Sequence, residues 1–136
     1  MTSKADYQTH QTKKRLQRYG VNADPKHTRI DAGETELHVA SRALCGLVLA
    51  RAGHAFDIEV KINDAGDRID VLDFGGPDEH PIALEFESAP TKPTIETKLD
   101  KYVRNGPCRD CIVFDLRDAP TDIDELTEWI EGQLAL

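Results

Sequence analysis

Three acidic residues near the middle of the sequence have the types and the spacing of a cation site. Asp70 lies in the run 68–74, where apolar and polar side chains alternate. Glu85 and Glu87 lie in a second alternating run, 82–87. Alternation with a period of two is typical of a strand with one covered face, so pairing of the two runs would gather the three carboxylates at one end of one face. Carboxylates that lie so close repel one another, and a hard divalent cation neutralises such a cluster.

The strands that must position these acids are predicted by three alternating runs separated by residues typical of turns. The runs are 56–62, 68–74 and 82–87. We expect them to form three antiparallel strands. In the second strand, Ile69 and Val71 are expected on the face opposite Asp70.

An Asp on one strand followed by an acidic-x-acidic triplet on the next resembles the motif of the PD-(D/E)xK nuclease superfamily. This superfamily includes restriction enzymes, archaeal Holliday-junction resolvases and repair nucleases. Ile69-Asp70 corresponds to the first half of the motif, with Ile where Pro is common, and Glu85-Phe86-Glu87 to the second, with Glu87 where Lys is usual. The resemblance implies that Asp70 and Glu85 bind Mg²⁺ or Mn²⁺, that Glu87 acts on the attacking water, and that the protein cuts DNA as a homodimer.

A helix is predicted directly before the three strands. Residues 31–34 have the Asp-x-x-Glu spacing of a capping box, and apolar residues then recur at helical spacing as far as Gly53. These apolar residues are Leu37, Ala40, Leu44, Leu47 and Val48. The resemblance implies a metal-site Glu near the start of this helix, where Glu36 is the best match and Glu34 the competitor. Alternatively, both are acids that the helix dipole favours in a first turn. The single histidines His38 and His54 are expected to have surface or structural roles.

A second helix is predicted from Ile95 to about Arg104, capped by Thr94 and ended by residues 105–107. Lys98 and Lys101 lie on its flanks. In members of the superfamily whose triplet lacks Lys, a lysine from this helix reaches the scissile phosphate, and the resemblance implies Lys98 in that role. The alternative is that both lysines are solvated helix residues.

The last third of the chain predicts one more strand and one more helix. Cys108 and Cys111 have C-x-x-C spacing, but a structural zinc site needs four ligands and a redox pair opens a helix, whereas this pair precedes the strand 112–116. A capped helix is expected to begin at 121–125. Its apolar face comprises Ile123, Leu126, Ile130 and Leu134. The full order, αβββαβ(α), is that of a restriction-endonuclease-like α/β core over residues 31–136, with a mixed central sheet flanked by helices.

Charge is distributed unevenly along the 136 residues, whose net charge is −8. Residues 1–30 contain seven Lys and Arg against two Asp, a net charge of +5, so the remaining residues carry −13. We therefore expect a basic N-terminal arm, residues 1–30, that contacts DNA through Lys13, Lys14, Arg15 and Arg18, or alternatively a solvated terminus. The acidic excess of the body is typical of proteins from salt-adapted, halophilic microbes.

Length and composition predict one soluble domain. No apolar run approaches a membrane span, and three cysteines cannot pair completely, which indicates a reducing, cytoplasmic environment. The leading functional hypothesis is a Mg²⁺-dependent DNA nuclease that acts in repair, recombination or replication. The alternatives are a non-catalytic nuclease-like domain that binds nucleic acid or a protein, and a small acidic interaction protein.

Overall fold

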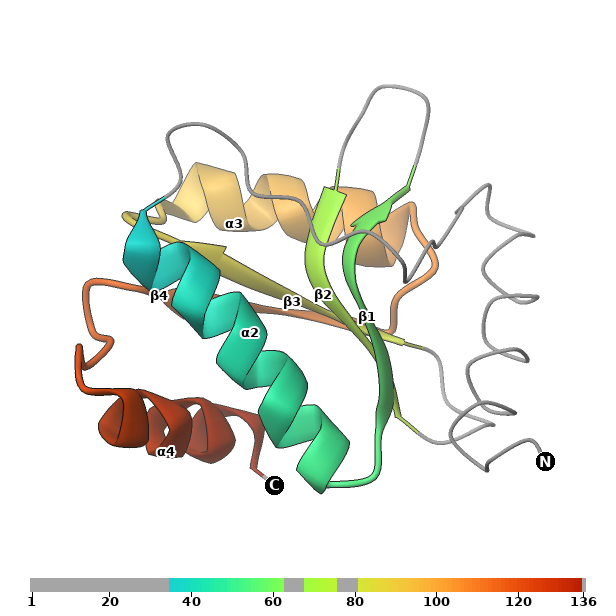
Figure 1. Ribbon diagram of the computed structural model, residues 1–136. Helices are drawn as coiled ribbons and strands as arrows, with labels where there is room; N and C mark the ends of the chain where they lie inside the picture. Colours follow the sequence, from blue (N-terminus) through green and yellow to red (C-terminus); the bar gives the residue numbers. More distant parts are fainter. Residues whose placement is uncertain (1–34, 63–67, 76–80, 136) are drawn as a thin grey trace, which may run out of the picture.

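The computed structural model describes residues 35–62, 68–75 and 81–135 (Figure 1). Its elements are α2 (Glu36–Arg51), β1 (Ala55–Lys61), β2 (Arg68–Gly75), β3 (Ile82–Glu87), α3 (Lys92–Leu99), the π-helical turn η1 (Asp100–Arg104), β4 (Asp110–Asp115) and α4 (Ile123–Leu134). The predicted order of helix, three strands, helix, strand and helix is confirmed for these residues. The expected capping box and basic arm, with Glu34, Lys13, Lys14, Arg15 and Arg18, lie outside the described residues.

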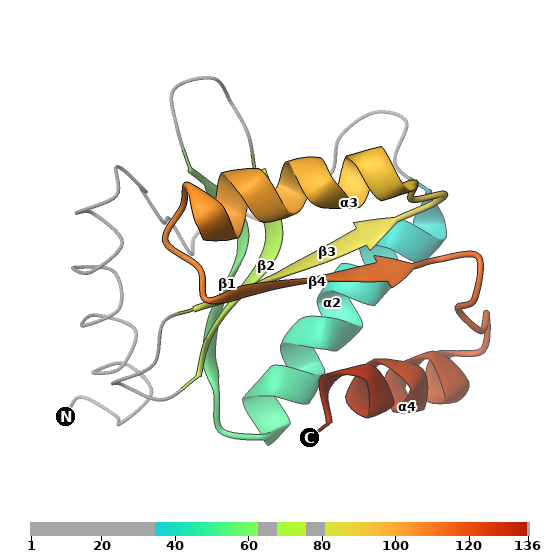
Figure 2. The same cartoon turned by 180° about the vertical axis from the view of Figure 1, so that it is seen from behind.

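The described strands form one mixed sheet in the order β1-β2-β3-β4. The predicted antiparallel pairing of β1 with β2 and of β2 with β3 is confirmed, and β4 lies parallel to β3 after a crossover through α3. Helices α2 and α4 cover one face of the sheet, and α3 covers the other (Figures 1 and 2). The fold is therefore mixed α/β, with apolar clusters on both faces of the sheet.

The alternation of side chains breaks in the middle of β1 and of β2. Ile69 packs in the apolar cluster on the α3 side of the sheet, whereas Val71 packs in the cluster on the side of α2 and α4. The expectation that both face away from Asp70 is therefore wrong. In the neighbouring strand Glu59 has a φ of 55°, a left-handed conformation that L residues with a side chain adopt at a cost. In both strands, the side chains beyond this point therefore lie on the opposite face of the sheet from the one that strict alternation predicts. The change occurs at Glu59 in β1 and at Asp70 in β2.

Helix α2 begins later than its expected capping box, because Thr35 is the cap residue and its hydroxyl accepts the His38 N–H at 3.1 Å. Its buried face is also different from the expected stripe. The buried side is made up of Ser41, Arg42, Cys45, Gly46, Val48 and Leu49. Of the predicted stripe, Val48 is buried and Leu37, Ala40 and Leu44 pack against the core, whereas Leu47 is 42% exposed. The covered side of the helix is wider than the stripe because α2 packs on both the sheet and α4.

Helix α3 begins earlier than predicted, at Lys92, with Thr91 as its cap in place of Thr94. Pro93 lies in the first turn of the helix, where proline is tolerated because its missing N–H has no intrahelical partner there. At the other end, the Asn105 N–H donates to the Asp100 carbonyl at 2.9 Å, which closes the wider π-helical turn. In α4, Leu126 and Ile130 are buried as expected.

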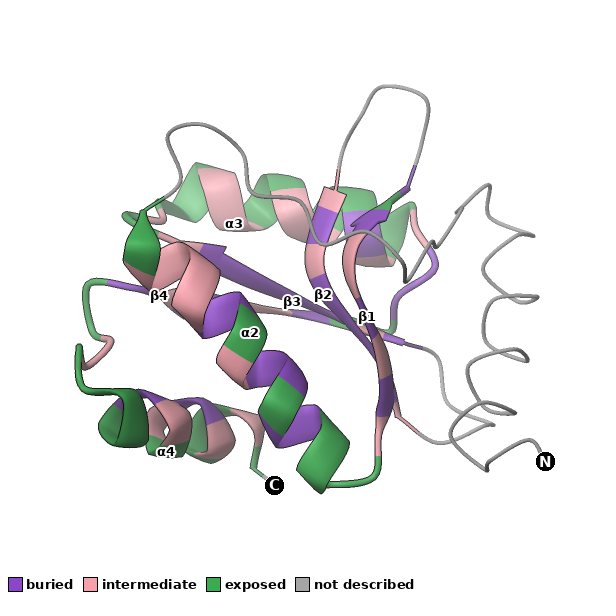
Figure 3. Cartoon of the chain, viewed as in Figure 1, coloured by how far each residue is buried: buried purple, intermediate pink, exposed green. Residues whose placement is uncertain are grey.

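Figure 3 shows that burial is concentrated in the inner strands and on the inward sides of the helices. Ile123 is an exception to the predicted apolar face of α4, since it is 65% exposed at the first turn. Cys45, Cys108 and Cys111 are all buried and free. No helix in the described part of the chain is long and apolar enough to cross a membrane.

Candidate functional site

The three acids of the motif meet at the point where β2 and β3 separate. The pairing of these strands ends at Val71 and Leu84, so Asp70 and Glu85 are the first residues beyond it. The Asp70 N–H donates to Glu85 Oε2 at 2.9 Å, and the Phe86 N–H donates to Asp70 Oδ2 at 2.8 Å. Two carboxylates therefore take the place of the next strand-to-strand hydrogen bonds, which fixes both of them between the diverging strands.

Lys98 approaches the same acids from α3. Its Nζ lies 2.9 Å from Glu85 Oε1 and 2.8 Å from Glu87 Oε1. Glu85 is buried, with its side chain 2% exposed, whereas the side chain of Glu87 is 33% exposed. The two glutamates thus share one face of the sheet, as expected, and Asp70 lies between the strands beside them. Among the described residues, Lys98 supplies the positive charge that links Glu85 to Glu87.

These groups border a hollow of about 450 Å³, which we call the acidic hollow. It is lined by Thr35, His38, Arg68, Asp70, Glu85, Phe86, Glu87, Ser88, Ala89 and Lys98. The lining comes from α2 and its cap, the inner strands, the segment after β3, and α3. Residues far apart in the sequence therefore form one polar, open-sided site.

The protonation states at this site differ sharply between neighbouring groups. Burial, followed by the negative charge of Asp70, raises the pKa of Glu85 to about 7. Burial also opposes the charged form of Asp70, but hydrogen bonds from His38 and the Phe86 N–H outweigh it and lower the pKa of Asp70. Burial acts against the charge of Lys98 as well, yet Glu85 and Glu87 raise its pKa. At neutral pH the site therefore contains a charged Asp70 and a charged Lys98, beside a Glu85 carboxyl that holds its proton more strongly than an exposed glutamate does.

Two residues of α2 support Asp70, and neither stands out in the sequence as a site residue. His38, expected in a surface or structural role, places Nε2 3.2 Å from Asp70 Oδ2. Arg42 is buried, with Nη1 2.9 Å from Glu59 Oε1 and 3.9 Å from Asp70 Oδ1. One available signal was the i, i+4 spacing of His38 and Arg42, which puts two polar residues on one side of an otherwise apolar helix.

Glu59 completes this arrangement from the edge strand β1. Its side chain is only 5% exposed, and its second oxygen lies 3.9 Å from Nη1 of Arg68. Glu59 also has the left-handed backbone conformation. The residue at which the alternation of β1 breaks is therefore the same one that forms the buried ion pair with Arg42. No sequence pattern signalled either feature.

Glu36 does not join the other predicted metal ligands. It is exposed in the first turn of α2 and is not among the residues that line the acidic hollow. Within the described residues, no group of three or more His, Cys, Asp or Glu side chains is arranged to hold a metal ion. Asp70 and Glu85 nevertheless offer hard oxygen ligands, and Mg²⁺ often binds through one or two carboxylates while keeping several waters. The pair fits a Mg²⁺ ion of that hydrated kind, provided that Lys98 gives up one oxygen of Glu85.

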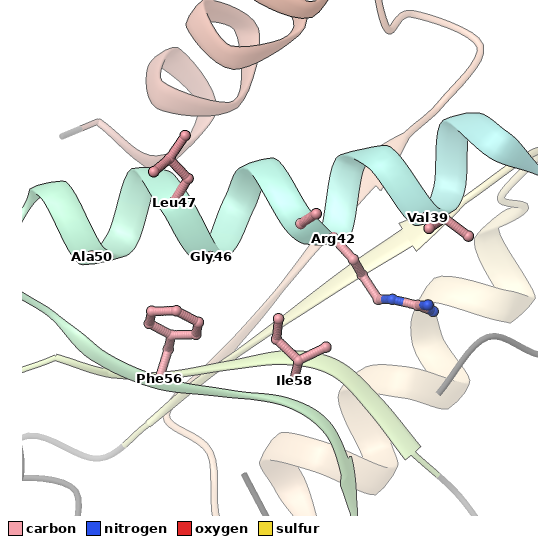
Figure 4. A pocket seen from close by; sticks show the side chains of 8 residues that line it. Val39, Arg42, Gly46, Leu47, Ala50, Phe56 and Ile58 are labelled. Carbon is pink, nitrogen blue, oxygen red and sulfur yellow. The ribbon is translucent and has the colours of Figure 1, made fainter. Parts of the chain in front are cut away.

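A second hollow, of about 360 Å³, lies between α2 and β1 and has an apolar lining (Figure 4). Gly46 and Ala50 of α2 lie opposite Phe56 and Ile58 of β1, and Arg42 stands at one end (Figure 4). Apart from Arg42, its lining has no ionisable side chain, so it offers no acid, base or nucleophile for a reaction.

No protein-family model, curated protein or solved structure matches this chain. The acidic hollow, with the carboxylates of Asp70 and Glu85 and the ammonium of Lys98, is therefore the feature of the described chain that bears on its function.

Proposed function

We propose that the chain is a metal-dependent DNA nuclease with a restriction-endonuclease-like core of the PD-(D/E)xK type. One observation carries the proposal: Asp70 and Glu85 are held side by side between diverging strands, with the ammonium of Lys98 2.9 Å from Glu85. Two carboxylates next to a cation in an open polar hollow are what a metal-assisted attack on a phosphodiester requires. The order of helices and strands supports the same proposal.

Asp70 and Glu85 are the proposed ligands of Mg²⁺ or Mn²⁺. Such an ion, when bound, polarises a phosphoryl oxygen and lowers the pKa of a bound water. Neutralisation by a cation would also relieve the repulsion that raises the pKa of Glu85. Cation binding and ionisation of Glu85 should therefore favour one another.

Lys98 and Glu87 have different proposed roles. Because its two glutamate partners raise its pKa, Lys98 stays protonated and cannot serve as the general base. We assign its ammonium to the scissile phosphate, where it would stabilise the charge that develops. Glu87 is the more exposed of the two glutamates and can reach a water in the hollow, so we assign it the orientation or deprotonation of the attacking water.

The remaining parts of this proposal concern DNA contact and assembly. The basic residues Lys13, Lys14, Arg15 and Arg18 are proposed to contact the DNA backbone, because they carry positive charge on an otherwise acidic chain. Cutting both strands of a duplex with one active site per chain would require a homodimer.

Substitutions of Lys98 and Glu87 test the assignment of roles. In a nicking assay with Mg²⁺ or Mn²⁺, we expect Lys98→Met to lower the rate about 10²–10³-fold through lost charge stabilisation. Glu87→Gln should lower it roughly 10²–10⁴-fold if Glu87 acts as the base. Lys92→Met is the matched lysine control, because Lys92 is exposed in the first turn of the same helix and lines neither the acidic hollow nor the one beside it. If all three substitutions lowered the nicking rate equally and only slightly, neither Lys98 nor Glu87 would have its assigned role.

A non-catalytic domain that binds nucleic acid or a protein is the second candidate, and a specific observation favours it. Both oxygens of Glu85 already have partners in the protein, since Oε2 accepts from the Asp70 N–H and Oε1 lies 2.9 Å from Lys98. In that case Lys98 is a permanent substitute for a metal ion. Lys98→Met separates the candidates, because it should strengthen Mn²⁺ binding if the lysine competes with a metal and should leave binding absent if there is no metal site.

A further inference from the structure

A second polar hollow adjoins the acidic hollow along α3. It has a volume of about 350 Å³, and we call it the α3 groove. Its lining is Glu87, Pro93, Thr94, Thr97, Lys98, Lys101 and Tyr102. Glu87 and Lys98 line both hollows, so the two adjoin each other at this ion pair. A polymer bound at Asp70 and Glu85 therefore has a path that continues over α3.

The side of α3 that faces this groove is polar and basic. Thr94, Thr97, Lys98 and Lys101 recur at the i, i+3, i+4 and i+7 spacing of one helix face. The hydroxyl of Thr97 donates to the Pro93 carbonyl at 2.8 Å. Because the hydroxyl proton of Thr97 is engaged in this hydrogen bond, Thr97 contributes polar surface but no free donor. The positive charge of the groove comes from the two lysines.

The acids of α3 lie on a different side of the helix. Glu96 and Asp100 both pair with Arg104, whose Nη1 lies 2.9 Å from Glu96 Oε2 and 2.5 Å from Asp100 Oδ1. Arg104 thus offsets negative charge outside the groove. In the groove itself, Lys98 shares its charge between Glu85 and Glu87, and Lys101 adds a second ammonium, which attracts an anion.

We propose that the α3 groove binds the sugar–phosphate backbone of a DNA strand next to the phosphate held at the acidic hollow, with Lys101 as the phosphate contact. This inference rests on the proposed nuclease function. Lys98 lies in α3 and Lys101 in the adjoining turn η1, and both line the groove, so they can meet neighbouring phosphates of one strand. Lysine and threonine are among the residues that commonly contact DNA phosphates, and such contacts fix the register of the strand without reading its sequence.

The adjacency of the two hollows favours a nucleic acid over an acidic protein. A strand has charges at regular intervals and must leave the acidic hollow on two sides, one of which is the α3 groove. An acidic protein would need no such connection to Asp70 and Glu85. The groove therefore sets the direction in which the strand runs past the reacting phosphate.

The test is DNA binding by the full chain in EDTA, measured by fluorescence anisotropy with labelled single-stranded and duplex DNA over a range of KCl. Lys101→Ala should lower the slope of log K against log[KCl] by about 0.9 for duplex or about 0.7 for single-stranded DNA, because one phosphate contact is lost. Lys101→Arg should retain the wild-type slope. Arg51→Ala is the matched control, since Arg51 is exposed in the last turn of α2, away from both hollows.

Each outcome decides for or against the groove. Equal slopes for Lys101→Ala, Arg51→Ala and the wild type would overturn it, as would a wild type that binds no DNA. Competition by polyglutamate as effective as by DNA would show a general polyanion surface and also contradict the proposal. Binding in EDTA is independent of cleavage, so Mg²⁺-dependent nicking with an unchanged Lys101→Ala slope would reject the groove alone. A lowered slope without any nicking would reject the nuclease and keep the groove.

Discussion

Replacing Glu85 by Gln should change how the stability of the protein depends on pH. Glu85 has an ordinary pKa of 4.5 that burial and the charge of Asp70 raise to about 7 in the folded chain. A carboxyl with a raised pKa takes up a proton on folding, so its contribution favours the folded state at low pH and is lost as the pH rises toward 7. Integrating the proton uptake between these two pKa values gives a loss of about 2 kcal/mol between pH 5 and pH 7.

The assay is urea denaturation of the wild type and Glu85→Gln at pH 5 and pH 7, followed through the fluorescence of Trp129, whose ring packs edge-on against Phe114. The wild type should lose about 2 kcal/mol more than the variant over this interval. Glu87→Gln is the control, because that side chain also contacts Lys98 but remains one-third exposed to water. If the free energy of unfolding changed equally with pH in the wild type and in Glu85→Gln, the raised pKa of Glu85 would be refuted.

Three further substitutions test the packing around the site, all by chemical denaturation. Arg42→Met should destabilise the fold by roughly 3–5 kcal/mol, because it removes the nearer of the two arginines that neutralise the buried carboxylate of Glu59; a smaller loss in the Arg42→Met/Glu59→Met double variant would confirm this cause. Gly132→Ala should stabilise α4 by about 0.5–1 kcal/mol, because a Cβ there meets nothing within 4 Å. Gly46→Ala should lack that gain, since its Cβ would lie 2.9 Å from Cε2 of Phe56, and a gain equal to that of Gly132→Ala would contradict the packing of α2 on β1.

Local patterns were sufficient to predict the elements that carry the site. The alternating runs predicted β1, β2 and β3 and their antiparallel pairing, because each run shows its own covered face. Lys98 was predicted near Glu85 and Glu87 from the resemblance, and the structure brings all three together. The caps were less well predicted: threonines at 91 and 94 both suit a cap, and only the tolerance of Pro93 in the first turn decides between them.

The support of Asp70 could not be predicted, because it depends on contacts between distant segments. His38 and Arg42 contact the strands only after α2 has packed on the sheet. The left-handed conformation of Glu59 has no sequence signal, since that conformation is usual for glycine or asparagine. The break in alternation at Asp70 likewise occurs where β2 separates from β3. It depends on how the two strands pair, so the sequence of either strand alone does not reveal it.

The most direct test of the central claim is the initial rate at which the purified chain nicks plasmid or four-way-junction DNA in Mg²⁺ or Mn²⁺. The wild type should cut, EDTA should stop it, and Asp70→Asn should abolish it while circular dichroism shows the fold unchanged. Asp73→Asn is the matched control, because Asp73 is a buried acid on the same strand that pairs with His54 and does not line the acidic hollow. A wild type that binds DNA but cuts no substrate with either metal, or an Asp70→Asn variant that cuts at the wild-type rate, would contradict the assignment of Asp70, Glu85 and Lys98 as a nuclease centre.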